Sequence, residues 1–366
     1  MGEIPFDSAF HAPVLVEEVR EALAGARRAL DGTLGGGGHA LALLDAGADV
    51  TGLDRDPEAI EAARARLARF AREGRFHALR GNFADVDAIP ALAGAAFDAI
   101  LLDLGVSSHQ VDDERRGFSF REGAPLDMRM EGRRPKAEGA RQTTGGGSEA
   151  DRPGGAGTAA ELLNSADARE LIRLFREYGD EPRAARLAHE IVRRRANRPF
   201  AVSDDLVGAI RAVLGPRSGP PDFARLFQAV RIAVNDELAS LERALPALRD
   251  RLLPAGVLAV IAYHSGEDRI VKNAFREWSR SCVCPPRQPV CTCGGRAQGA
   301  LIHKKSVTAS SDEIARNPRA RSARLRAWRK AALTASGPVP GPASGPASGP
   351  KRAANAATGA PAGRVT

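Results

Sequence analysis

Hydrophobic positions in the first hundred residues alternate between continuous runs and helical spacing. Four segments predict strands, at 27–33, 49–54, 76–83 and 97–105, and the last of them is a continuous apolar run typical of a buried parallel strand. Three segments have apolar residues at helical spacing, at 11–23, 40–47 and 56–73. The last of these has Asp56 as a predicted N-cap and Pro57 in its first turn. Strands that alternate with helices predict a doubly wound α/β fold with a parallel sheet.

This alternation stops near residue 112 and resumes near residue 223. We therefore predict a sheet domain in two parts, 1–111 and 223–335, interrupted by a basic helical insertion over 112–222. The second part begins with one long helix, 224–253, followed by a strand over 255–265 and a helix over 267–280. Two segments are predicted to be disordered: 133–158, which is rich in Gly, Pro and charged residues, and 336–366, which contains the repeat GPASGPASGP.

Charge and composition indicate which partners and which cellular location to expect. The formal net charge of +8 favours polyanionic partners such as nucleic acid. No run approaches the roughly 20 apolar residues of a membrane span, and the N-terminus lacks a signal pattern, so we expect a cytoplasmic protein without a membrane partner. Two groups of arginines are candidate phosphate contacts: Arg193, Arg194, Arg195 and Arg198, and Arg316, Arg319, Arg321, Arg324 and Arg326. Solvated basic faces are the alternative.

Four cysteines form two C-x-C pairs within one short segment, at Cys282, Cys284, Cys291 and Cys293. Four thiolates can bind zinc tetrahedrally, but C-x-C is less typical of zinc than C-x-x-C, so reduced thiols remain the alternative. This segment lies outside the strand ends, where ligands of such a fold bind. We expect no metal among the binding and catalytic residues.

Four consecutive glycines, residues 35–38, follow the first predicted strand, where a ligand can approach bare backbone. The run lacks the third glycine of the G-x-G-x-x-G dinucleotide fingerprint, because Ala40 stands in its place. Asp54 ends the second strand and can accept hydrogen bonds from a ribose diol. These features suit either NAD or S-adenosylmethionine, and a merely flexible loop is the third reading.

Longer motifs favour one of these readings. The stretches HAPVLVEEV, DGTLGGGGH, LLDLGVSSHQ, RLFQAVRIAVNDEL, AYHSGEDRIVK and NPRARSARLR occur in this order along the chain. Together they resemble the small-subunit ribosomal RNA methyltransferase H family (RsmH, also called MraW). The resemblance covers residues 11 to about 330, apart from 133–158. It implies a Rossmann-like class I methyltransferase sheet with an inserted helical domain for RNA recognition.

The resemblance also implies an activity and its residues. The activity is transfer of a methyl group from S-adenosyl-L-methionine to the exocyclic N4 of a cytidine in the decoding region of small-subunit (16S) ribosomal RNA. The implied cofactor contacts are Gly37, Gly38, His39, Asp54, Phe83, Asp103 and Gln110. Without the surrounding motifs, His39 would be read as a helix cap, Phe83 as core packing and Gln110 as an exposed loop residue.

Catalytic roles are expected at the ends of the fourth and fifth strands, at Asp103, His264 and Ser265. The family usually reads FHSLED where this chain has YHSGED, so Tyr263 and Gly266 change the surroundings of His264. Two other function classes remain open from the residues alone. A dehydrogenase would bind NAD, and a catalytically silent RNA-binding protein would not need Asp54 and Asp103.

Overall fold

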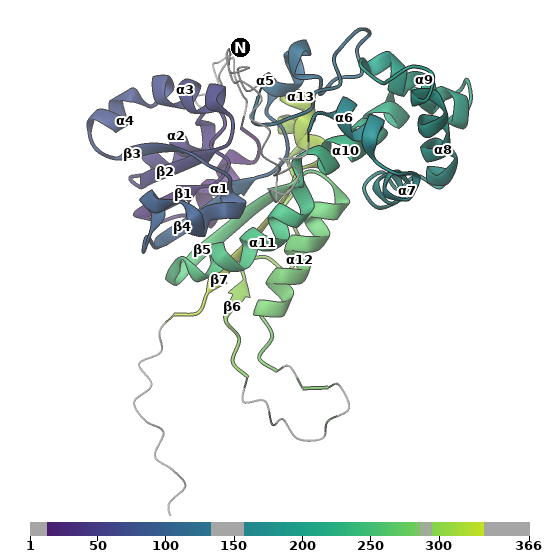
Figure 1. Ribbon diagram of the computed structural model, residues 1–366. Helices are drawn as coiled ribbons and strands as arrows, with labels where there is room; N and C mark the ends of the chain where they lie inside the picture. Colours follow the sequence, from purple (N-terminus) through teal and green to yellow (C-terminus); the bar gives the residue numbers. More distant parts are fainter. Residues whose placement is uncertain are drawn as a thin grey trace, which may run out of the picture. The chain divides into compact units, whose positions relative to one another are not determined.

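A single seven-stranded sheet organises the protein (Figure 1). The computed structural model describes residues 13–132 and 157–332, apart from positions 283, 286, 287, 289–291, 293 and 294. The strands are β1 Arg28–Asp31, β2 Asp49–Asp54, β3 Phe76–Arg80, β4 Phe97–Asp103, β5 Leu252–Ala262, β6 Gly299–Leu301 and β7 Arg324–Lys330. Their order is β3-β2-β1-β4-β5-β7-β6. Strands β1 to β5 are parallel, whereas β7 runs antiparallel to both β5 and β6.

Helices account for most of the remaining described chain. The α-helices are α1 Val16–Ala22, α2 Gly38–Asp45, α3 Pro57–Arg66, α4 Ala68–Arg72, α5 Ser108–Asp112, α6 Ala159–Ser165, α7 Ala168–Glu177, α8 Ala184–Arg195, α9 Ser203–Leu214, α10 Pro220–Asn235, α11 Glu237–Asp250, α12 Ser265–Trp278 and α13 Ser311–Arg316. The 3₁₀ turns are η1 Phe83–Ala88, η2 Pro90–Leu92, η3 Glu114–Arg116 and η5 Pro318–Ser322. None of the helices in the described part of the chain is long and apolar enough to span a membrane.

Both faces of the sheet are buried, which explains the continuous apolar strands. In β4, Ala99 and Leu101 pack into the core beneath α1 to α4, while Ile100 and Leu102 pack into the core beneath α11 and α12. Successive side chains of a strand point to opposite faces, so a strand covered on both sides has no polar face. The predicted doubly wound α/β fold is confirmed.

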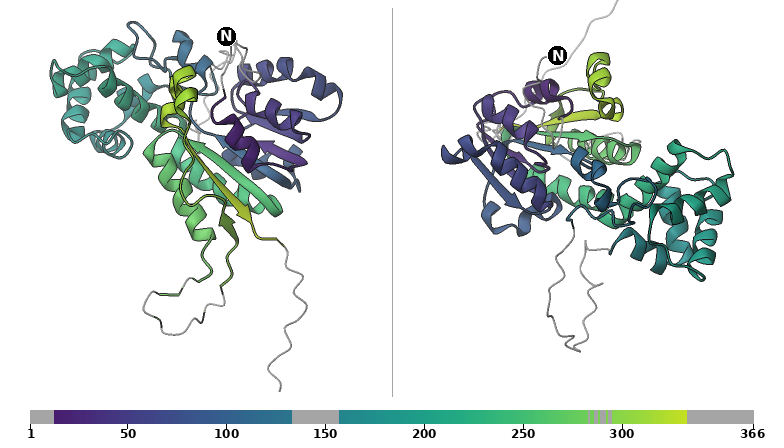
Figure 2. Two further views of the ribbon diagram at one scale, coloured as in Figure 1. Left: turned by 180° about the vertical axis from the view of Figure 1, so that it is seen from behind. Right: turned by 90° about the horizontal axis from the view of Figure 1, so that it is seen from above.

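The inserted helices α6 to α10 build a third core of their own, beside the sheet (Figures 1 and 2). Leu171, Phe175 and Ile191 are fully buried in it. This core also contains Phe223 and Val234 from α10, so packing continues the insertion to the end of α10 and not to residue 222. The described residues up to Ala332 nevertheless form one compact unit.

Several predicted elements differ from the observed ones. The helix predicted over 224–253 is two helices, because Asp236 adopts the left-handed conformation (φ 49°) between α10 and α11. The helix over 56–73 is likewise interrupted at Leu67. The helix predicted over 11–23 is shorter, because α1 spans only Val16–Ala22. Strands β6 and β7 were not predicted, since the arginines of β7 mask its alternating apolar residues.

The last two residues of the segment predicted to be disordered, 157 and 158, are described by the structure. Thr158 is the N-cap of α6, accepts a hydrogen bond from the Glu161 amide and takes part in a capping box. Residues 133–156 and the predicted tail over 336–366 lie outside the described residues.

Candidate functional site

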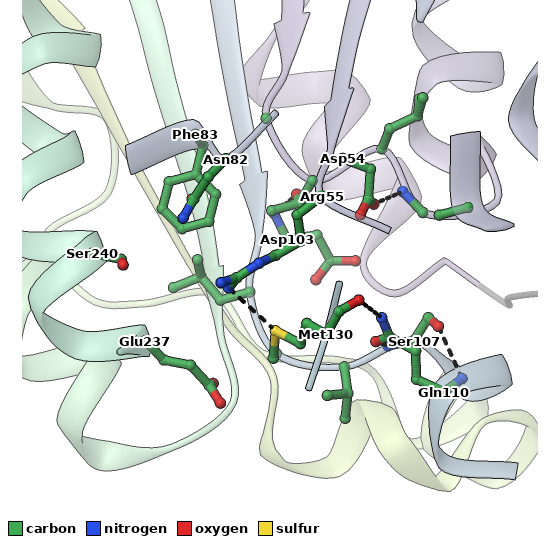
Figure 3. Close-up of a pocket in the computed structure, with 18 of the residues that line it drawn as sticks. Asp54, Arg55, Asn82, Phe83, Asp103, Ser107, Gln110, Met130, Glu237 and Ser240 are labelled. Carbon is green, nitrogen blue, oxygen red and sulfur yellow. Dashed lines mark hydrogen bonds between the residues drawn. The ribbon is translucent and has the colours of Figure 1, made fainter. Parts of the chain in front are cut away.

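A pocket opens at the carboxyl edge of the parallel strands (Figure 3). The segments that follow β1 to β5 contribute to it, together with the first turn of α11. Its polar and charged lining residues include Thr33, His39, Asp54, Arg55, Asn82, Asp103, Ser107, Gln110, Glu237, Ser240, Tyr263 and Glu267. Ligands of doubly wound folds bind at this edge, outside the carboxyl ends of the strands. The pocket is therefore the candidate site.

The glycine-rich turn forms one wall of this pocket. Gly35 (φ +50°) donates its amide to Asp54 Oδ2 over 2.8 Å, and Gly38 lines the pocket at the start of α2. Gly37 (φ +76°) faces away, since a Cβ there would lie 3.0 Å from the Leu67 side chain. No side chain caps the N-terminus of α2, which leaves its first backbone amides available to an anionic group.

Asp54 ends β2 and is tied to the neighbouring backbone. Its Oδ1 accepts from the Asp56 amide over 2.9 Å, while its Oδ2 accepts from Gly35. Burial raises the pKa of Asp54, and the two amides oppose that shift. Each carboxylate oxygen has a second lone pair, so this acid can still accept hydrogen bonds from a ligand.

Phe83 also lines the pocket and packs partly against the core beneath α11. It begins η1, and the preceding Asn82 caps that turn by accepting from the Ala84 amide over 3.0 Å. In Figure 3, Asn82 and Phe83 lie together at the rim of the view, near the end of β3. The aromatic ring thus offers a flat apolar surface on the wall formed by the third strand.

Asp103 lies at the end of β4, between two side chains from distant parts of the chain. The Tyr263 hydroxyl donates to its Oδ1 over 2.8 Å, and His39 Nε2 lies 3.4 Å from its Oδ2. The Asp103 amide donates to Thr33 Oγ1 over 2.6 Å. Burial, followed by the nearby negative charge of Asp103, raises the pKa of Tyr263 well above 10, so Tyr263 remains a proton donor. His39 does not cap a helix; it sits buried in the first turn of α2.

A second acid, Asp31, lies beneath this group at the end of β1. Its side chain is 1% exposed, and its Oδ1 accepts from the Thr33 amide over 3.1 Å. Burial raises the pKa of Asp31 to about 7, although the neighbouring His39 acts in the opposite direction. Sequence reasoning did not select Asp31, because it resembles an ordinary strand end.

Gln110 lies on the opposite wall, where its polar groups are already engaged. Its amide nitrogen donates to Asp56 Oδ2 over 2.9 Å, and its oxygen accepts from the Ser107 amide over 3.0 Å. Arg116 donates to the same Asp56 oxygen over 2.8 Å and to the Met130 carbonyl over 2.9 Å. Gln110 is 6% exposed, so it is not the exposed loop residue that it would be taken for without the surrounding motifs. Its hydrogen bonds stabilise the part of the pocket wall that it lines.

The two residues predicted after β5 do not line the pocket themselves. His264 caps α12, and its Nε2 lies 3.2 Å from Glu267 Oε1, while Ser265 is exposed in the first turn. Their neighbours Tyr263 and Glu267 line it instead. Glu267 Oε2 accepts from the Tyr263 amide over 2.8 Å. The side chains of this strand end that face the cavity are therefore not the two that the sequence analysis selected.

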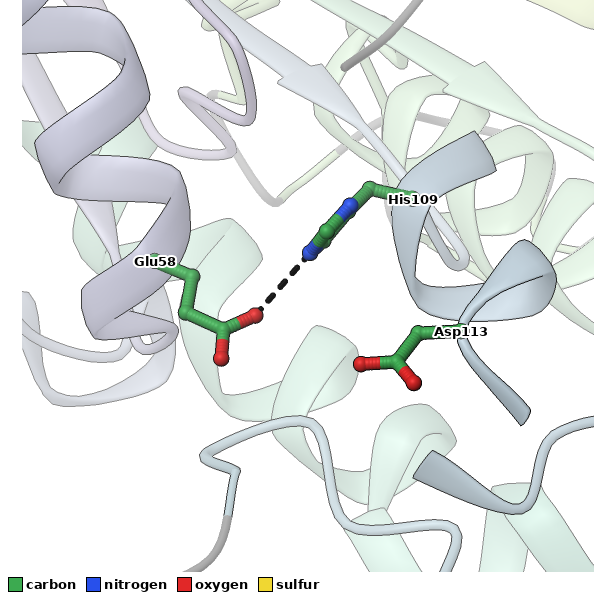
Figure 4. Close-up of side chains that lie close together, drawn as sticks. All are labelled: Glu58, His109 and Asp113. Atoms are coloured by element: carbon green, nitrogen blue, oxygen red, sulfur yellow. Dashed lines mark hydrogen bonds and ion pairs between the residues drawn. The ribbon is translucent and has the colours of Figure 1, made fainter. Parts of the chain in front are cut away.

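Glu58, His109 and Asp113 form a polar cluster outside the pocket, between α3 and α5 (Figure 4). His109 Nε2 lies 3.0 Å from Glu58 Oε2, and Arg116 donates to the same oxygen over 3.3 Å. Asp113 is paired with Arg115 over 2.8 Å, which lowers the pKa of Asp113. Because guanidinium groups already neutralise both carboxylates, we interpret this cluster as ion pairing that joins α3 to α5.

The candidate phosphate-binding arginines divide into two groups. At the end of α8, Arg193 and Arg194 both pair with Glu190, and their hydrogen bonds lower the pKa of Glu190 to about 2. Arg195 donates to two carbonyl oxygens near the end of α6. Arg194 and Arg195 are therefore engaged within the insertion, whereas Arg193 and Arg198 are largely exposed beside Glu190 and Asp205.

The arginines around α13 and β7 are less engaged. Arg316, Arg319, Arg321 and Arg324 are exposed, whereas Arg326 makes a bidentate pair with Asp268 over 2.7 and 3.1 Å. Arg319 lies 3.2 Å from Asp112 at the end of α5. Of the cysteines, Cys282 is exposed and Cys284 is half-buried, and Cys291 and Cys293 lie outside the described residues.

Comparison with known proteins identifies close relatives. The MraW methylase family matches residues 8–142 and 152–331. The ribosomal RNA small subunit methyltransferase H of Gemmatimonas aurantiaca is 62% identical over 322 residues, which cover 88% of this chain and 96% of that protein. The protein of the same name from Heliobacterium mobile is 45% identical, over 87% of this chain and 98% of its own length. An rRNA methylase structure from Streptococcus thermophilus aligns with 86% of this chain and 93% of its own at 10% identity and a TM-score of 0.35.

Proposed function

This chain belongs to the MraW methylase family, and on that premise we propose that it methylates small-subunit (16S) ribosomal RNA at the exocyclic N4 of a cytidine in the decoding region. The methyl donor is S-adenosyl-L-methionine. The observation that carries the proposal is one continuous pocket lined by two acids, Asp54 and Asp103, at the carboxyl ends of β2 and β4. The strand order, with antiparallel β7 between β5 and β6, is typical of class I methyltransferases.

The residues around β1 to β3 fit the donor. Asp54 would accept hydrogen bonds from the ribose diol, and Phe83 would lie against the adenine. The uncapped N-terminus of α2, at Gly38 and His39, would hold the carboxylate of the methionine moiety. Gln110 would shape the wall beside it. Gly37 would act through the backbone conformation of the turn, since its α-carbon faces α3.

The residues around β4 and β5 fit the nucleophile. S-adenosylmethionine supplies a methyl group on a positively charged sulfur, so a carbon–nitrogen bond forms while the carbon–sulfur bond breaks and the sulfur keeps the electron pair. Asp103 would accept an N–H of the cytosine amino group, which localises the nitrogen lone pair, and would receive the proton lost after attack. Tyr263 holds Asp103 in place for this task. Positioning of the two reactants should supply most of the rate.

The RNA path is proposed to pass the arginines near α13. Arg316, Arg321 and Arg324 are exposed, whereas Arg194 and Arg195 are half-buried and bonded within the protein, and the exposed Arg193 shares Glu190 with Arg194. Replacing Arg321 and Arg324 with glutamine should reduce the salt dependence of binding to small subunits by about two units of slope. Arg193→Gln should leave that slope unchanged, so equal slopes in both variants would move the path elsewhere. Action on ribosomal subunits also supports the predicted cytoplasmic location.

The decisive experiment follows a labelled methyl group. Small subunits from cells that lack this enzyme are incubated with the purified protein and methyl-labelled S-adenosylmethionine, and the RNA is digested and mapped by mass spectrometry. We expect a single labelled N4-methylcytidine in the decoding region. Label on another base or atom, or none, would overturn the proposal. Thermal shift with S-adenosylmethionine and with NAD, measured separately, tests the dehydrogenase alternative.

A further inference from the structure

The break between α10 and α11 places an acid at the pocket in a way that a continuous helix would not. Asp236 is held in the left-handed conformation, which is unfavourable for a residue other than glycine. The preceding Asn235 fixes the break, because its Nδ2 donates to the Met128 carbonyl over 2.7 Å and its Oδ1 accepts from the Met130 amide over 2.9 Å. Met130 itself lines the pocket. The strained turn is thus anchored to the site, and Glu237 follows it directly.

Glu237 is oriented by a bidentate pair. Arg231, one turn before the end of α10, donates from Nε and Nη2 to the two Glu237 oxygens, each over 2.9 Å. The Glu237 side chain is 8% exposed and lines the pocket, with Ser240 beside it in the first turns of α11 (Figure 3). Planar bidentate pairing fixes the plane of the carboxylate, while each oxygen retains a lone pair for another donor.

Glu237 and Asp103 both line the pocket. In Figure 3, Asp54 and Glu237 lie on opposite sides of the pocket with Asp103 between them. Glu267 lines the same pocket and accepts a hydrogen bond from the amide of Tyr263. The Tyr263 hydroxyl in turn reaches Asp103. Two acids therefore face the region where the proposed nucleophile must sit.

From this arrangement we propose that Glu237, oriented by Arg231, determines specificity for a base with an exocyclic amino group. The inference rests on the proposed function. Cytosine carries two N4–H donors, so one can bond to Asp103 and the other to Glu237. Uracil presents only an acceptor oxygen at the same position. A carboxylate cannot donate a hydrogen bond to this oxygen and repels it. A site built to accept a hydrogen bond strongly rejects an analogue that lacks the donor.

The main test compares Glu237→Gln with Glu242→Gln, a matched change at an exposed acid of the same helix. Cytidine and uridine 5′-monophosphates are titrated into protein saturated with S-adenosylhomocysteine, and binding is followed by saturation-transfer NMR. An amide can donate to the uracil oxygen, so we expect the preference for cytidine to fall at least threefold in Glu237→Gln and to stay at the wild-type value in Glu242→Gln. An unchanged preference in Glu237→Gln overturns the inference.

Methyl transfer to small subunits gives an independent readout. Glu237→Gln should lower kcat/KM by about ten- to a hundredfold while S-adenosylmethionine affinity stays within twofold of wild type. If Glu237→Gln does not fold, Glu237→Asp decides, because it keeps the charge but withdraws the carboxylate; an unchanged nucleotide preference there overturns the inference. Absence of methyl transfer by the wild-type protein would instead refute the proposed function, and the nucleotide preference would still be measurable.

Discussion

The two ends of the pocket are built in different ways. At the end formed by β1 to β3, Asp54 is held by two backbone amides, one from Asp56 close to it in sequence and one from Gly35 in the turn after the adjacent strand. At the end formed by β4, β5 and α11, Asp103 is held by Tyr263, 160 residues later in the chain, and Glu237 is held by Arg231 across a helix break. We call the first the cradle end, because backbone amides hold its acid. We call the second the assembled end, because side chains hold its acids. We expect the cradle end to tolerate side-chain substitutions around it. At the assembled end, we expect the loss of a single side-chain atom to change activity.

The sharpest test of the assembled end is Asp103→Asn. It preserves the shape of the side chain but removes the negative charge that would accept the amino proton. We expect single-turnover methyl transfer to fall about 10²- to 10³-fold, in the range of a lost general base. S-adenosylmethionine affinity, measured by calorimetry, should change by less than tenfold. A variant with wild-type turnover would show that another group accepts the proton.

Asp31→Asn tests whether the buried acid Asp31, near Asp103, is neutral in the folded protein. Because burial raises the folded-state pKa of Asp31 from 3.8 to about 7, its neutral form contributes stability at low pH that is lost as pH rises through 7. The wild-type protein should therefore lose about 3 kcal/mol relative to Asp31→Asn between about pH 5 and pH 8. Urea unfolding of both proteins at each pH measures this difference. Parallel stability curves would contradict the assignment of a neutral Asp31.

Asp54→Ala tests the cradle end. Loss of hydrogen bonds from the ribose to a charged acceptor should cost about 1.5–3 kcal/mol, or roughly ten- to a hundredfold in S-adenosylmethionine affinity. The amides of Gly35 and Asp56 also lose their acceptor, so a modest fall in thermal stability should accompany it. Asp49→Ala, at the exposed start of the same strand, is the control. Equal affinities of the two variants would remove Asp54 from the donor site.

Tyr263→Phe should have the smallest effect, since it removes one hydroxyl and keeps the ring. The carboxylate of Asp103 would lose its 2.8 Å donor and become easier to protonate. We expect the acidic limb of the kcat–pH profile to move to higher pH, with a rate loss of only about threefold to tenfold at neutral pH. Folding and cofactor affinity should stay at wild-type values. An unmoved acidic limb would show that Tyr263 only fills space.

Sequence reasoning recovered the cradle end better than the assembled end, and the reason is physical. The apolar runs of β1, β2 and β4 are local signals, and Asp54 and Asp103 are recognisable because they end such runs. Glu237 carries no comparable signal, since an unbroken apolar stripe across Asp236 predicts one helix. Only tertiary contacts, above all those of Asn235, impose the break. Spacing therefore places strand ends but not the side chains that turn into the cavity.

The antiparallel strand β7 shows a second limit. Leu325, Ala327 and Trp328 are fully buried in the sheet, yet the arginines between and around them resemble a solvated basic tail. Arg326 is neutralised by Asp268 of α12, a partner that no local pattern reveals. Burial of a long cationic side chain beside a strand depends on such a distant carboxylate. The basic surface available to RNA is correspondingly smaller than the sequence suggests.

The pairing of β4 with β5 also has a consequence for how the chain folds. Leu101 pairs with Ala259, so the whole helical insertion must be enclosed in the loop that this contact closes. Closing so long a loop has a large entropic cost, and folds dominated by such contacts form slowly. The helices α6 to α10 depend mainly on near neighbours and can condense first, as a unit that brings the two strands together. During synthesis, the edge of β4 that pairs with β5 would therefore stay unpaired until the ribosome has released more than half of the remaining chain.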